Sequence, residues 1–101
     1  MSPAGFRASL SGAAPAPDLA APVAALWWAA KGGWDEAHKL VQDEDSAEAA
    51  WVHAYLHRVE GDLGNAGYWY RQAGKPVAAG ALEIEWNEIV AALLGGGRVR
   101  A

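Results

Sequence analysis

The chain has 101 residues, of which 52% are hydrophobic and 20% are charged, a composition that fits a single globular domain. Its formal net charge of −4 argues against a nucleic-acid partner, because nucleic-acid binding needs a basic face. The lack of cysteine excludes disulfides and thiolate chemistry. No apolar run approaches the ~20 residues that cross a bilayer, and no signal peptide is recognisable. We therefore expect a cytoplasmic protein that binds neither nucleic acid nor membrane.

Residues 1–21 are predicted to form an N-terminal arm that is partly extended. Ser2 followed by Pro3 is typical of a helix start, which predicts a short helix through Leu10. Phe6 and Leu10 lie four residues apart and would fix this helix to the body; without a groove for them, the arm would be disordered. The Ala/Pro-rich segment 12–17 is expected to run extended.

Residues 22–94 are predicted to form a single α-helical domain, followed by a tail at residues 95–101. Glycines end several helices, Asp45 and Asp62 are predicted N-caps, and no segment alternates as a strand does. In the last helix the glutamates, Glu85 among them, are expected to face solvent. The predicted helices span Pro22–Lys31, Trp34–Gln42, Ser46–Glu60, Leu63–Ala73 and Ala81–Leu94.

Small residues recur at a fixed offset in two parts of the chain. Gly32 and Gly61 are 29 residues apart, and Ala25 with Ala54 and Ala37 with Ala66 show the same offset. Such recurrence is typical of an α-hairpin repeat, in which small residues let helices approach closely. The sequence therefore predicts an all-α fold of four to six helices, arranged as two stacked antiparallel helix–turn–helix hairpins plus a C-terminal capping helix.

The second copy resembles the tetratricopeptide repeat, and the resemblance extends over residues 22–76. The residues that carry it are Ala54, Gly61-Asp62 at the turn, the run Ala66, Tyr70 and Ala73, and the closing Pro76. The unit is shorter than the family's ~34 residues, and only two copies are present. The resemblance implies a surface that binds a protein or peptide partner. The string EGDLGNAGYWYRQAG also resembles a family of small uncharacterised bacterial proteins, which implies no activity.

Aromatic residues are more numerous than a core of this size can enclose, since each ring has ~150–250 Å² of surface. The candidates for a binding surface are Trp27, Trp28, Tyr68 and Trp69. Two alternatives stay open: the rings edge the core, or a homodimer covers them. The leading hypothesis is a non-enzymatic helical-repeat module that binds a protein, a peptide or itself.

A second hypothesis rests on His53, His57 and Glu60, which follow one another at helical spacing along one face. Two imidazoles and a carboxylate suit a divalent metal such as zinc, and His38 could support them if the fold brings it close. The spacing is not the metalloprotease motif, and structural packing of the histidines against Trp and Tyr is the favoured interpretation.

Two further interpretations of the sequence are a small-molecule pocket and enzymatic chemistry. A small-molecule pocket between the helices at Pro22–Lys31 and Ser46–Glu60 would be lined by Trp27 or Trp28 together with His53. Enzymatic chemistry is disfavoured, because the sequence contains no recognisable nucleophile–base pair. Apart from the zinc-type metal of the second hypothesis, no cofactor is predicted.

Overall fold

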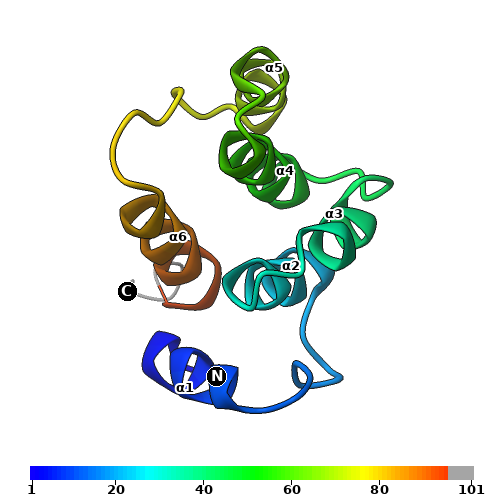
Figure 1. Cartoon of the computed structure of the whole chain (residues 1–101), viewed down its shortest axis with the longest axis vertical. Helices are drawn as coiled ribbons and strands as arrows, with labels where there is room; N and C mark the ends of the chain where they lie inside the picture. The colour runs from blue at the N-terminus through cyan, green and yellow to red at the C-terminus, as the bar shows by residue number, and fades with distance from the viewer. Residues whose placement is uncertain (96–101) are drawn as a thin grey trace.

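The computed structural model describes residues 1–95, which form six α-helices and no strand, so the all-α prediction is confirmed. Figure 1 shows the helices arranged around the centre of the molecule. A 3₁₀ turn at Ser9–Ser11 follows the first helix, and a π-helical segment at Ala91–Gly95 follows the last. The helices are α1 (Pro3–Ala8), α2 (Ala21–Ala30), α3 (Trp34–Val41), α4 (Ala47–Glu60), α5 (Leu63–Ala73) and α6 (Leu82–Val90).

Helices α2 and α3 form one hairpin, and α4 and α5 form a second. The turns contain Gly32 and Gly61, whose φ angles of +82° and +88° are left-handed and favour glycine. All four alanines of the 29-residue offset, Ala25, Ala37, Ala54 and Ala66, are at most 1% exposed. The recurring alanines are therefore buried between the helices.

Local hydrogen bonds set the helix ends. Asp62 caps α5 by accepting the Asn65 N–H at 3.2 Å, as predicted, and Gly74 ends that helix with a φ of +71°. The predicted cap at Asp45 is wrong. Ser46 caps α4 instead, because its extended backbone aims the hydroxyl at the Ala49 N–H, 3.1 Å away, while Asp45 is exposed.

Helix α6 lies against α2 and α4. Ile89 and Val90 are fully buried there, and the Trp86 indole donates a hydrogen bond to the Leu26 carbonyl at 2.9 Å. The predicted N-terminal helix is present as α1, and its Phe6 ring is buried and stacked on Trp86 with 5.9 Å between ring centroids. The first and last helices thus complete the core that the two hairpins begin. Beyond Gly95, the predicted tail lies outside the described residues.

A buried polar group joins α4, α5 and α6. Glu85 is 4% exposed, contrary to its predicted solvent-facing position, because it pairs with Arg58 at 2.7 Å and accepts the Tyr70 hydroxyl hydrogen bond. Arg58 also donates to the Gly80 carbonyl at 2.6 Å. None of the helices in residues 1–95 combines the length and the apolar character of a membrane span.

Candidate functional site

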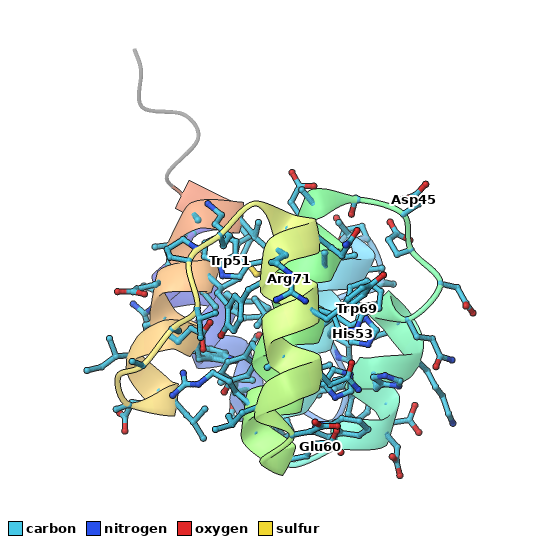
Figure 2. All side chains as sticks on the ribbon, turned by 90° about the horizontal axis from the view of Figure 1, so that it is seen from above. Asp45, Trp51, His53, Glu60, Trp69 and Arg71 are labelled. Carbon is cyan, nitrogen blue, oxygen red and sulfur yellow. The ribbon has the colours of Figure 1, made fainter. Side chains whose placement is uncertain are left out.

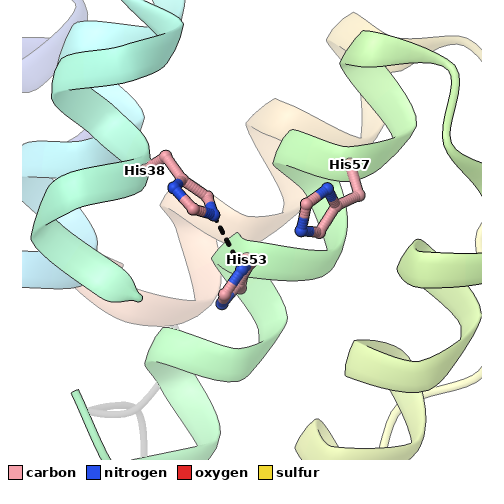
Figure 3. A group of neighbouring side chains, drawn as sticks. All are labelled: His38, His53 and His57. Atoms are coloured by element: carbon pink, nitrogen blue, oxygen red, sulfur yellow. Dashed lines mark hydrogen bonds between the residues drawn. The ribbon is translucent and has the colours of Figure 1, made fainter. Parts of the chain in front are cut away.

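All three histidines of the chain meet between α3 and α4 (Figure 3). His53 and His57 lie four residues apart on α4 and so share a face, and α3 packs there and contributes His38. The Nε2 atoms of His38 and His53 are 3.1 Å apart. One nitrogen from each of the three rings lies within 4.8 Å of the other two. We call these residues the three-histidine cluster.

Indole rings hold two of these imidazoles in place. The Trp69 ring from α5 stacks on His53 at a centroid distance of 4.0 Å and an angle of 14°, and Figure 2 shows the two side by side. The Trp34 ring stacks on His38 at 4.8 Å and 11°, and its N–H donates to the Leu56 carbonyl at 2.7 Å. The cluster is therefore fixed by aromatic packing from α3 and α5.

Glu60 orients the third imidazole. Its carboxylate lies 2.6 Å from His57 Nδ1, which leaves Nε2 as the nitrogen of His57 that is available to a ligand. The predicted set of His53, His57 and Glu60 is thus brought together, but Glu60 engages the far side of the His57 ring. The third nitrogen of the cluster comes from His38, which the sequence suggested only as a supporting residue.

Burial keeps two of the three imidazoles, those of His38 and His53, neutral near pH 7. Desolvation, followed by repulsion from His38 and His57, lowers the pKa of His53 to about 4. Desolvation by burial also lowers the pKa of His38, and repulsion from His57 lowers it further. Neutral imidazoles keep a nitrogen lone pair, which is the form that binds metals.

The hydrogen bonding of the cluster is incomplete. His53 Nδ1 is buried and has no hydrogen-bond partner among the described residues. Leaving such a group unsatisfied costs ~1–3 kcal/mol, and unsatisfied groups in native proteins call for an explanation.

The other predicted site residues lie in two different places. Trp27 is fully buried, with its N–H 3.2 Å from Ser9 Oγ, and Trp28 packs edge-on against it at 5.1 Å, so both belong to the core around α2. A fully buried Trp27 offers no surface to the predicted small-molecule pocket. Tyr68 is exposed, and its ring packs perpendicular to the Trp69 ring with 5.1 Å between ring centroids.

Trp34 was missed as part of the site, although the spacing of Trp34 and His38 contained a signal. The two residues are four apart, so on a helix they share one face. Because one face of this helix carries an indole and an imidazole, that face could have been expected to pack against the helix that carries the His-x3-His spacing.

Comparison with known protein families, with curated proteins and with solved structures found no match. The resemblance of residues 22–76 to tetratricopeptide repeats therefore stays a prediction. The chemistry available to the three-histidine cluster follows from its donor atoms and from the groups packed around them.

Proposed function

We propose that this protein binds a divalent transition metal ion of the zinc type through His38, His53 and His57. The observation that carries the proposal is the convergence of three ring nitrogens, two of them 3.1 Å apart. Two nitrogens that each lie ~2.0–2.1 Å from a tetrahedral zinc ion are roughly 3.3 Å apart. The spacing of His38 and His53 is close to that value, and a nitrogen of His57 lies within 4.8 Å of both.

The donor set favours particular ions. Three imidazole nitrogens suit zinc, copper, nickel and cobalt, whereas magnesium and calcium prefer oxygen ligands. The lowered pKa values of His38 and His53 keep these rings unprotonated near neutral pH, so protons do not compete with the metal. Glu60 supplies the outer carboxylate that commonly fixes the tautomer of a metal-bound histidine.

Equilibrium dialysis of tag-free protein against zinc tests the proposal. We expect one equivalent to bind to the wild type and binding to weaken at least tenfold in His38→Gln. Glu44→Gln, which removes an exposed carboxylate from the loop before α4, is the matched control and should bind as the wild type does. Absence of binding by the wild type, or equal binding by His38→Gln, would refute the proposal.

The partner-binding role predicted from the sequence stays a prediction. Helix α6 covers the face that α2 and α4 present, so the chain itself occupies that position. The exposed side chains of Leu63 and Tyr68 on α5 are where a protein, a peptide or a second copy of the chain would bind. Light scattering on the purified protein distinguishes a monomer from a homodimer.

A further inference from the structure

The three-histidine cluster contains one donor too few for a closed tetrahedral site. Among residues 1–95, no fourth histidine, aspartate or glutamate joins the trio within the same 4.8 Å. Two carboxylates lie within 4.8 Å of a His57 nitrogen, and both have other partners: Glu60 contacts His57 Nδ1, and Asp62 caps α5 through the Asn65 N–H. A closed structural zinc site has four protein ligands, whereas three ligands leave a position for an exogenous molecule.

The charge of the ligand set determines what fills that position. Three imidazole ligands bring no charge to a divalent ion, and the Glu60 carboxylate on His57 offsets only one of its two charges, while the stacked rings of Trp34 and Trp69 reduce the local polarity. An anion is therefore attracted more strongly than a neutral ligand of the same size. Resting on the proposed function, we infer that the metal-loaded cluster binds one small anion, of the size of azide or acetate, at an open coordination position.

The burial of the ligands limits the size of this anion. His53 and His57 are only 4% and 6% exposed, and Trp69 covers one face of the His53 ring. His38 is half-buried, and the side chain of Glu60 is 38% exposed, so solvent reaches this group of residues at His38 and Glu60. Ligands that are this buried favour a small carboxylate over a bulky one.

Cobalt(II) reports on the open position, because its visible spectrum depends on coordination number and geometry. We would load the wild-type protein with one equivalent of cobalt(II) and titrate it with azide, with acetate and, at matched ionic strength, with weakly coordinating perchlorate. We expect azide and acetate to change the visible bands with one-site saturation and perchlorate to leave them unchanged.

The outcomes separate this inference from the proposal on which it rests. If the wild type develops no cobalt band, or if His38→Gln develops the same band, metal binding at the cluster is refuted and the anion site falls with it. If the band forms in the wild type, is lost in His38→Gln and is unaffected by excess azide and acetate, the cluster binds metal but its coordination is closed. That last result overturns the anion site alone.

Discussion

His53 is separated from water on both faces of its ring. The Trp69 ring stacks on the His53 ring with 4.0 Å between ring centroids, and the His57 ring stacks on it with 4.9 Å between centroids. A protonated imidazole in this position would lose its hydration and be repelled by two other histidines. The environment of this single residue therefore selects the neutral form that a metal requires, and it makes the fold sensitive to acid.

The first prediction concerns this acid sensitivity. His53 has an ordinary pKa of 6.5 in the unfolded chain and about 4 in the folded protein, so the unfolded state binds a proton first as the pH falls. The stability that depends on neutral His53 is complete above pH 6.5 and is lost progressively toward pH 4. A difference of this size corresponds to ~3 kcal/mol in the free energy of unfolding.

Urea unfolding in the presence of a chelator, at about pH 7 and about pH 4.5, measures this loss. His53→Gln is the control, because it removes the titrating ring and leaves the carboxylates that also titrate in this range. The variant should lose less stability than the wild type between the two pH values. An equal loss in both proteins would show that His53 does not carry the effect.

Gly61 and Gly64 form a matched pair for a backbone prediction. Gly61 has a φ of +88°, where a side chain is strained, whereas Gly64 lies in the first turn of α5 with open space at its Cβ position. Gly61→Ala should lower the free energy of unfolding by ~1–2 kcal/mol. Gly64→Ala should raise it by ~0.5–1 kcal/mol. Chemical denaturation of both variants checks the pair, and a shift in the same direction would contradict the assignment of the α4–α5 turn.

Helices α4, α5 and α6 are connected by the ion pair of Arg58 and Glu85 and by the Tyr70 hydroxyl. Burial, followed by the hydrogen bond to Glu85, raises the pKa of Tyr70, so its hydroxyl remains a donor. The arrangement gives every charged oxygen of Glu85 a partner in a position where water has little access.

Removing one partner of the Arg58–Glu85 ion pair should lower the free energy of unfolding. Arg58→Met leaves Glu85 buried without its cation, and breaking a buried pair in this way typically costs ~3–5 kcal/mol. Arg71→Met, an equivalent change at an exposed position of α5, should alter stability by no more than ~0.5 kcal/mol. Thermal and urea unfolding of the two variants would contradict this account if their effects were similar.

The helices themselves could be predicted because their limits depend on neighbouring residues. Gly61 and Gly74 end helices through their own backbone angles, and Asp62 caps α5 through a residue three positions on. The burial of Glu85 could not be predicted in this way, because it depends on Arg58 and Tyr70, which lie in two other helices. Periodicity defines the faces of a helix but does not identify the element that covers each face.

The same distinction, between residues of one helix and residues brought together from several helices, applies to the candidate site. His53, His57 and Glu60 lie within one helix, so their grouping follows from spacing. His38 joins them only because the α2–α3 hairpin packs against α4, and Trp69 because α5 folds back over α4. The sequence thus grouped two of the three proposed ligand nitrogens, and the third required the tertiary arrangement.

The three-histidine cluster bridges the two hairpins, since His38 belongs to one and His53 and His57 to the other. A metal bound there would cross-link them and would bind the folded chain only. At a free concentration one hundred times its dissociation constant, such a ligand stabilises the fold by ~2.7 kcal/mol. For a domain of this size we expect zinc to raise Tm by on the order of 10 °C. Differential scanning calorimetry should show no such rise in His38→Gln, and an equal rise in that variant would place the ion elsewhere.

Metal binding by three converging imidazoles is the central claim, and an anomalous difference map at the zinc absorption edge tests it most directly. In crystals of the zinc-loaded protein, we predict one peak between α3 and α4, ~2.0–2.1 Å from a ring nitrogen of each of His38, His53 and His57. Crystals that contain zinc only at surface carboxylates, with the three rings still in mutual contact, would contradict the claim.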